Sequence, residues 1–299
     1  ANDGGYDIVH AHLLFPGVYT GFAKILGLTK ARTCISYHNE AYAPGCNKPG
    51  LGLWLRKRLN AIACRRGMDG RLAVSKACAD HYQTHLKPGP IEVIPNPVDV
   101  AAIDGAVSGV QRNKRKTLQM LLPGRLVPEK GHAVLIAALK ILADEGPDFK
   151  VVFAGDGPLK ETIIEQIKAA GFSGRAELTG FIAHADLMKM MRRADIVIIP
   201  SIFEGFGLTA VEAMLAGTPV IAARTGGLAE IIDHGNSGLL FPSGDEKALA
   251  KSIRDLAANA ALRKQLAISG RKACENRYAL PGIIKKLRAF YAGLVAEKA

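Results

Sequence analysis

Residues 196–213 read IVIIPSIFEGFGLTAVEA. The apolar run 196–199 is typical of a buried strand, Pro200 ends it, and a helix is expected from Leu208 to Ala216. A loop containing two glycines separates these elements. A strand, a short loop and a helix in this order form the repeating unit of a parallel α/β sheet. The stretch therefore predicts an α/β fold, with its loop at the carboxyl end of a strand.

The same alternation runs through the rest of the chain in two series. Strands are expected at 7–11, 32–36, 70–74 and 91–94, and again at 117–122, 149–154, 175–179, 196–199, 219–222 and 238–241. A doubly wound domain has about six strands, which the second series supplies. The first series has fewer, so either that domain is reduced or its opening strands precede this chain. The first residue is Ala1 and not Met, which favours the second interpretation.

Composition sets wide bounds on partners and location. The chain has 299 residues, and its hydrophobic fraction of 48% excludes intrinsic disorder. Its formal net charge of +12 favours anionic partners. No apolar run approaches the ~18 residues of a membrane span. The cysteines are five in number without a CxxC pair, and no secretory signal is present. These features predict a cytoplasmic protein with reduced thiols.

The basic charge is concentrated in residues 48–71, where Asp69 is the single acid. Leu51, Trp54 and Leu55 alternate there with cations, as in a helix that lies on an anionic membrane face. The alternative is a helix packed on its own domain with its arginines extended to solvent. Nucleic-acid binding is not expected. Only the basic charge supports it, and aromatic residues, on which bases would stack, make up only 6% of the chain.

Two carboxylates bracket the glycine loop of the opening stretch. Glu204 follows the strand, and Glu212 lies in the first turns of the next helix. Carboxylates at such a place accept hydrogen bonds from the hydroxyls of a ligand, and the backbone of Gly205–Gly207 can approach negative charge. Either glutamate alone could simply complement the helix dipole. The pair with Phe-Gly between them is not explained in that way.

Two further segments follow strand ends. Residues 124–131 read GRLVPEKG, and an arginine and a lysine here suit a diphosphate, as a planar fork and a point charge. In the alternative interpretation Lys130 is a solvated residue and Arg125 pairs with Glu129, and this segment alone favours neither. Residues 155–158 read GDGP, which suits an anion site but is also ordinary turn chemistry.

Two histidines alternate on the first expected strand. His10 and His12 face the same way and could bind a metal, but no third ligand cluster accompanies them. A hydrogen-bonding role is therefore favoured, and no metal site is expected. The absence of D-x-D and of G-x-S-x-G argues against a metal-dependent transferase of the GT-A class and against a serine hydrolase.

Together these segments resemble the large retaining family 4 of glycosyltransferases, which have the GT-B fold of two facing Rossmann-like domains. The matching segments cover nearly the whole chain; they are Glu204 with Glu212 in E-x7-E, GRLVPEKG at 124–131, GDGP at 155–158, PNPVD at 95–99, GGLAEII at 226–232 and NSGLLFPSGDEKALA at 236–250. The resemblance implies an incomplete first domain at 1–112, a nucleotide-sugar domain at 113–278, and a C-terminal helix at 279–299 that returns towards the first domain. Residues 99–116 are expected to be the linker.

The resemblance also implies roles for the candidate residues. Arg125 and Lys130 would stabilise the leaving diphosphate, Glu204 would bind donor-sugar hydroxyls, and Glu212 would hold the ribose. His38, in SYHNE, would lie beside the donor sugar and the acceptor. The remaining donor-binding residues would contribute through backbone or turn positions: Gly124, Gly155, Asp156, Gly157, Phe181, Ile182, Gly205, Phe206, Gly207 and Leu208.

The implied reaction is transfer of a hexosyl group, with retention, from a nucleotide-diphosphate sugar to a lipid-linked or saccharide acceptor in bacterial-type glycan assembly. No cofactor is expected besides this donor substrate. A peripheral position at the inner face of the cytoplasmic membrane would follow from residues 48–71. Two alternatives stay open, a non-catalytic GT-B remnant that binds a nucleotide-sugar and a GT-B sugar-nucleotide epimerase.

Overall fold

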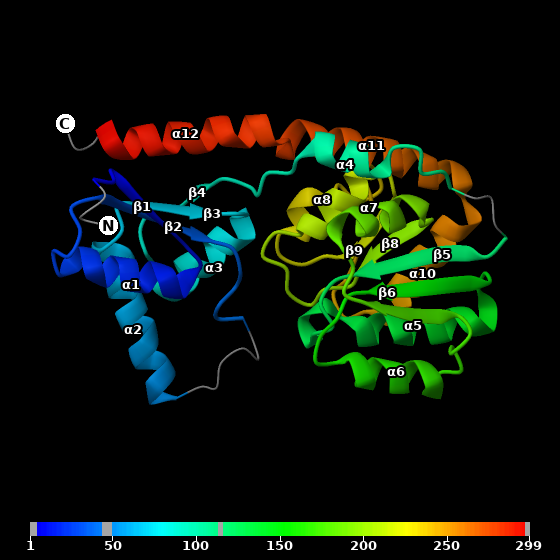
Figure 1. Cartoon of the computed structure of the whole chain (residues 1–299). Coiled ribbons are helices and arrows are strands. Elements are labelled where there is room, and N and C mark those ends of the chain that lie inside the picture. Colours follow the sequence, from blue (N-terminus) through cyan, green and yellow to red (C-terminus); the bar gives the residue numbers. More distant parts are fainter. Residues whose placement is uncertain (1–4, 44–49, 113–115, 297–299) are drawn as a thin grey trace. The chain divides into compact units, whose positions relative to one another are not determined.

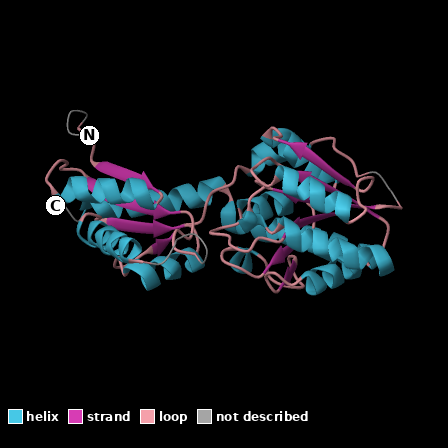
Figure 2. Cartoon of the chain, turned by 90° about the horizontal axis from the view of Figure 1, so that it is seen from below, coloured by secondary structure: helices cyan, strands magenta, loops and turns pink. Residues whose placement is uncertain are grey.

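The computed structural model describes residues 5–43, 50–112 and 116–296. The chain divides into two compact units, of which the first comprises Ala1–Pro97 with Leu280–Ala299 and the second Val98–Ala279. Each unit contains a fully parallel sheet with helices against it (Figures 1 and 2). The α/β class and the two parallel sheets predicted from the sequence are therefore confirmed.

The second unit is built on a six-stranded sheet in the order β10-β9-β8-β5-β6-β7. Its strands are β5 (Leu118–Pro123), β6 (Phe149–Ala154), β7 (Ala176–Gly180), β8 (Ile196–Ile199), β9 (Val220–Ala223) and β10 (Leu239–Phe241). The chain runs outward from β5 to β7 and then returns, so that β8 pairs with the other side of β5. Where the strand order reverses in this way, the loops at the carboxyl ends diverge and leave a crevice.

Helices cover both faces of this sheet. They are α4 (Val100–Val107), α5 (His132–Glu145), α6 (Lys160–Ala169), α7 (His184–Arg193), α8 (Leu208–Leu215), α9 (Leu228–Ile231), α10 (Glu246–Ala258) and α11 (Ala260–Tyr278). Helix α5 contacts α6 and α10, whereas α8 contacts α7 and α11. Figure 1 shows α5 and α6 on one side of the strands and α7 and α8 on the other.

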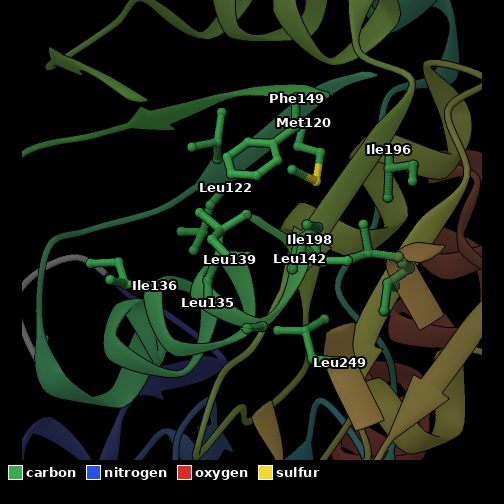
Figure 3. Packing of buried hydrophobic residues seen from close by; sticks show 14 of the residues in the cluster. Met120, Leu122, Leu135, Ile136, Leu139, Leu142, Phe149, Ile196, Ile198 and Leu249 are labelled. Atoms are coloured by element: carbon green, nitrogen blue, oxygen red, sulfur yellow. The ribbon is translucent and has the colours of Figure 1, made fainter. Parts of the chain in front are cut away.

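The core of the second unit explains why these segments form strands and helices. Alternate residues of β5, such as Met120 and Leu122, pack in one buried cluster with Leu135 and Leu139 of α5 and with Phe149 of β6 (Figure 3). A spacing of two on the strand and of four on the helix brings each set to a common face. Because the sheet is buried on both faces, its strands are almost continuously apolar.

The first unit has a four-stranded sheet in the order β1-β2-β3-β4. Its elements are β1 (Ile8–His12), α1 (Leu14–Ile25), β2 (Arg32–Tyr37), α2 (Leu51–Arg66), β3 (Gly70–Ala73), α3 (Lys76–Leu86), β4 (Glu92–Val93) and α12 (Leu280–Ala296). Helix α12 packs here although it directly follows the second unit in sequence. Ile283 of α12 forms a buried cluster with Leu72 and Ile94.

The division between the units falls after Pro97, earlier than the sequence placed it. Residues 100–107 of the expected linker 99–116 form helix α4, which the Asp99 side chain caps by accepting a hydrogen bond from Ala102 N. Ile103 buries the inner face of this short helix. On α11, Arg271 binds Asp104 of α4 at 2.8 Å. Helix α4 buries a single residue and is held by an ion pair to a residue far along the chain. Its hydrophobic periodicity is therefore too weak for the helix to be predicted from the sequence.

Several expectations concern single residues or membrane spans. The cysteines at 34, 64, 78 and 274 are buried and are not joined to one another by disulfides, while Cys46 and Lys48 lie outside the described residues. Within the described ranges, no helix combines the length and the apolar character that crossing a bilayer needs.

Helix α12 offers a direct test of the first unit's packing. Ile283 is 3% exposed and its neighbour Ile284 is 36% exposed. We expect Ile283→Ala to lower the free energy of unfolding by about 2–4 kcal/mol, since it opens a cavity against Leu72 and Ile94. Ile284→Ala removes the same atoms from a partly exposed position and serves as the matched control. Urea denaturation of both variants is the measurement, and equal losses would contradict this packing.

Candidate functional site

An ion pair joins two loops at the carboxyl ends of the strands of the second unit. Lys130 ends a short 3-10 helix, η1 (Pro128–Lys130), after β5, and Glu204 lies in the loop after β8. Lys130 Nζ donates to Glu204 Oε2 at 2.7 Å, and the two side chains are 20% and 16% exposed. The two loops that diverge at the strand-order reversal are thus joined by two of the predicted site residues.

The backbones of these loops also approach closely. Ile202 N donates to Glu129 O at 2.8 Å. Gly131, at the start of α5, has φ of 67°, and a Cβ atom there would lie 1.9 Å from Pro200 O. Only glycine satisfies both the left-handed conformation and this contact. The lysine beside it is therefore held at a fixed distance from the end of β8.

Two residues that the sequence did not single out stabilise the Glu204 loop. The buried Ser201 hydroxyl donates to Glu204 Oε2 at 3.3 Å, and Thr225 Oγ1 donates to Ile202 O at 3.0 Å. Gly227 N donates to the Glu204 carbonyl at 2.9 Å. Ser201 and Thr225 each follow the carboxyl end of a strand, and that position is the signal that could have identified them.

Arg125 lies exposed at the end of β5. No ion pair joins it to Glu129 in the part of the chain that the structure describes, in contrast to the alternative interpretation of this segment. Lys130 is likewise not a freely solvated residue, because it binds Glu204. The aliphatic stem of Lys130 passes close to Gly124, where a Cβ would lie 3.6 Å from Lys130 Cδ.

Glycines form the rim of the sheet next to this ion pair. A Cβ at Gly155, whose φ is 156°, would lie 2.0 Å from Gly124 O, and an isolated bridge links Gly155 to Gly180. Because glycine has no side chain, Gly124, Gly155 and Gly180 let the carboxyl ends of β5, β6 and β7 approach one another closely. The Asp156 carboxylate accepts from Gly157 N at 2.8 Å, so it stabilises its own turn.

Glu212 lies in the second turn of α8 and is 9% exposed. His184, the first residue of α7, donates through Nε2 to Glu212 Oε1 at 2.9 Å. Burial raises the pKa of the Glu212 carboxyl above its usual 4.5, and the contact with His184 opposes this shift. His184 was not predicted as a site residue, and its place at a helix start after a strand end is the available signal.

The aromatic residues of the predicted site differ in their surroundings. Phe181, directly after β7, is 87% exposed, and Ile182 beside it is partly exposed. Phe206 is buried, with its ring edge-on to Tyr278 at 5.4 Å between centroids. Phe206 can therefore contact a ligand only through its backbone, whereas Phe181 presents an apolar ring to solvent.

Three histidines of the first unit, His10, His12 and His38, lie together on β1 and directly after β2. His12 Nδ1 lies 2.9 Å from His38 Nε2, and the rings of His10 and His12 stack at 4.2 Å. His10 also lies within hydrogen-bond distance of Ser36 Oγ, at 2.8 Å, and of Tyr291 OH on α12, at 2.6 Å. Burial, with the neighbouring histidines, lowers the pKa of His10 to about 4.

The histidine cluster shows hydrogen bonding of the kind that the sequence favoured. Burial and the proximity of His12 also lower the pKa of His38. With its pKa lowered to about 4, His10 carries no charge near neutral pH. Among the described residues, no group of three or more His, Cys, Asp or Glu side chains is arranged to hold a metal ion.

The two halves of the chain match two family models. Residues 108–273 match the model "Glycosyl transferases group 1", and residues 1–102 match "Glycosyltransferase Family 4". The chain belongs to the glycosyl transferases group 1 family. The resemblance inferred from E-x7-E and the accompanying motifs is thereby confirmed.

Two curated relatives are 30–34% identical to this chain over the residues that align. The 2-deoxystreptamine N-acetyl-D-glucosaminyltransferase of Niallia circulans is 34% identical over 157 residues, which are 52% of this chain and 40% of that protein. The D-inositol 3-phosphate glycosyltransferase of Jonesia denitrificans is 30% identical over 293 residues, 90% of this chain and 68% of that protein. The chain spans 40–50% of the length of the first curated relatives that it matches.

Solved structures confirm the GT-B fold. Anabaena HepE in complex with UDP matches with a TM-score of 0.82 at 23% identity, over 96% of this chain and 79% of that chain. A sucrose-phosphate synthase of Thermosynechococcus elongatus matches with a TM-score of 0.84, also at 23% identity, over 98% of this chain and 75% of that chain.

Glu212 provides a test of the site through pH. Because the folded state holds the Glu212 proton more tightly than the unfolded state, the carboxyl lowers stability progressively as pH rises from 4.5 through its raised pKa. We expect Glu212→Gln to gain stability relative to the parent chain over this range. Urea denaturation at a series of pH values measures the difference. Glu165→Gln, at an exposed position of α6, is the control. A pH-independent difference for Glu212→Gln would contradict the raised pKa.

Proposed function

We propose that this group 1 family member transfers a hexosyl group, with retention, from a nucleotide-diphosphate sugar to a lipid-linked or saccharide acceptor in glycan assembly. The observation that carries the proposal is the pairing of Lys130 with Glu204 between the loops that follow β5 and β8, of which the β5 loop also contains the exposed Arg125. The two cations, Arg125 and Lys130, suit the diphosphate, and the carboxylate of Glu204 suits the sugar hydroxyls. The solved structures of HepE with UDP and with UDP-glucose support a nucleotide-sugar donor.

In the proposed mechanism the donor diphosphate competes with Glu204 for Lys130. The lysine and Arg125 neutralise the negative charge that develops on the leaving phosphate. Glu204, still fixed by Ser201 and by Gly227 N, then accepts hydrogen bonds from the sugar hydroxyls. The backbone of Gly205–Gly207 meets the sugar and phosphate.

The nucleoside is proposed to bind at the other loops of the rim. Glu212 is nearly buried and already accepts one hydrogen bond from His184, so it can accept another from a ribose hydroxyl. The base is proposed to lie near Phe181 and Ile182. Gly124 and Gly155–Gly157 provide close backbone approach next to the phosphates.

The acceptor is proposed to react on the same face from which the diphosphate departs. In that step the sugar–phosphate bond breaks, the departing phosphate oxygen takes the acceptor hydroxyl proton, and the new glycosidic bond forms with retention. His38 is proposed to contact the donor sugar and the acceptor. The mechanism requires no metal and no cofactor beyond the donor.

We further propose an anionic membrane surface as a partner of residues 48–71, and a peripheral position at the inner face of the cytoplasmic membrane. Helix α2 supports this, since Leu51, Trp54 and Leu55 are 79%, 52% and 51% exposed. Large apolar side chains that are exposed together on one helix are typical of a surface that meets a membrane or another protein. The lipid-linked acceptor and the membrane surface are parts of the same proposal.

Two variants test the donor-binding roles. We expect Lys130→Ala to weaken UDP-glucose binding by about tenfold or more, because it removes a charge-assisted contact. We expect Glu204→Ala to lower transfer by about 10²–10³-fold while the thermal unfolding midpoint stays close to that of the parent chain. Lys140→Ala, exposed on α5, is the matched control. Calorimetry measures binding, and UDP release with a panel of saccharide and lipid-linked acceptors measures transfer.

The products of this assay separate the proposed function from its alternatives. UDP-glucose binding without UDP release identifies a non-catalytic remnant, and a free epimerised nucleotide-sugar identifies an epimerase. The anomeric configuration of the product, read by NMR, tests retention. Unchanged turnover in Lys130→Ala or Glu204→Ala would refute the assigned roles.

A further inference from the structure

The first unit contains a pocket of about 400 Å³ between α2 and the end of α3. One wall is a single face of α2, on which Trp54, Lys57, Arg58 and Arg65 recur at helical spacing. The other wall is formed by residues 84–87 at the C-terminal end of α3. None of the residues assigned to the donor or to the acceptor lines this pocket.

The charge of this pocket is entirely positive. Lys57, Arg58, Arg65 and Lys87 line it, and no Asp or Glu is among its described lining residues. The one acid of the 48–71 stretch is bound elsewhere: Asp69 pairs with Arg32 at 3.1 Å and with Lys24 at 3.6 Å, both outside the stretch.

Two histidines lie beside Lys57 at the pocket. Lys57 Nζ lies 3.4 Å from His85 Nδ1, and the rings of His81 and His85 are 4.5 Å apart between centroids. Burial and then Lys57 lower the pKa of His85; burial, His85 and Lys57 together lower the pKa of His81 to about 4. Because these shifts keep both histidines uncharged near neutral pH, the positive charge of the pocket comes from its lysines and arginines.

The end of α3 would normally repel an anion, because its terminal carbonyls carry partial negative charge. Arg65 covers them: its guanidinium donates to Leu86 O at 2.7 Å and to Lys87 O at 2.8 Å. Arg58 lies over the Trp54 ring at 4.9 Å, so its guanidinium is held at the pocket wall by a cation–π contact. Arg65 thus offsets the negative charge of the carbonyls at the end of α3, and the contact with Trp54 orients Arg58 at the pocket.

We propose that this pocket binds a phosphate group, separately from the nucleotide-sugar site proposed in the second unit. A phosphate offers several acceptor oxygens and two negative charges, which matches Lys57, Arg58 and Lys87 around one cavity. The phosphate belongs either to a soluble phosphomonoester or to a lipid headgroup. The exposed Leu51 and Leu55 of the same helix favour the headgroup, a choice that rests on the membrane contact proposed for residues 48–71.

Trp54 provides an intrinsic reporter, since it is the only tryptophan of the chain and it lines the pocket. Glycerol 3-phosphate is the soluble probe, with glycerol as its uncharged counterpart. We expect glycerol 3-phosphate to change the Trp54 emission in the full chain, glycerol to have no effect, and added salt to weaken the response.

Matched variants on the same helix assign the response to the pocket. We expect Arg58→Gln or Lys57→Gln to weaken binding by roughly three- to tenfold, as for the loss of one partly exposed charge contact. Arg66→Gln removes the same charge from an exposed position of α2 that does not line the pocket, and it should leave the response to glycerol 3-phosphate unchanged. Lys130→Ala should also retain it, which separates this site from the proposed donor site.

Vesicles distinguish the two sources of phosphate. If the ligand is a headgroup, vesicles of phosphatidic acid in phosphatidylcholine should shift the Trp54 emission to shorter wavelength, and pure phosphatidylcholine vesicles should not. A response to glycerol 3-phosphate without this shift assigns the site to a soluble phosphomonoester. The proposal is overturned if neither probe changes the emission, or if Arg58→Gln and Lys57→Gln respond like the parent chain.

Discussion

Lys130 and Glu204 meet at 2.7 Å where the strand order of the second sheet reverses, and their contact sets the geometry of the surrounding loops. Divergent loops at such a reversal would otherwise be free to separate. The ion pair and the glycine contact at Gly131 join them, and the hydroxyl of Ser201 fixes the carboxylate. Both charged groups are therefore oriented before any ligand arrives, which lowers the ordering cost of binding.

Much of the fold was predictable from the sequence because parallel strands buried on both faces leave continuous apolar runs, and 149–154 and 196–199 were placed with the bounds that β6 and β8 have. The helices α4 and α11 were not predicted. Helix α4 depends on a cap by Asp99 and buries Ile103, and α11 buries small residues such as Gly270 and Cys274. Their stability comes from tertiary contact more than from local pattern.

The candidate site was predictable where function requires unusual residues at strand ends, as for Glu204, Glu212 and Lys130. The pairing of Lys130 with Glu204 was not predictable, because the two residues are 74 apart in the sequence. Each had also been assigned separately to a part of the donor, so neither called for a partner in the protein. His184 was missed for a related reason: a histidine at the start of a helix has no distinctive pattern until the fold brings it to a buried carboxylate. Long-range partners of this kind are set by topology, which sequence spacing does not encode.

The packing of α12 has a consequence for the order in which the protein matures. The second unit is continuous in sequence, so its core can close as soon as residue 279 has left the ribosome. The first unit begins earlier in the chain but is completed later, since Leu72 and Ile94 stay uncovered until α12 emerges. Throughout translation of the second unit, the nascent first sheet therefore presents an apolar surface that must be kept from other chains. Helix α12 ends this exposure when it packs against Leu72 and Ile94.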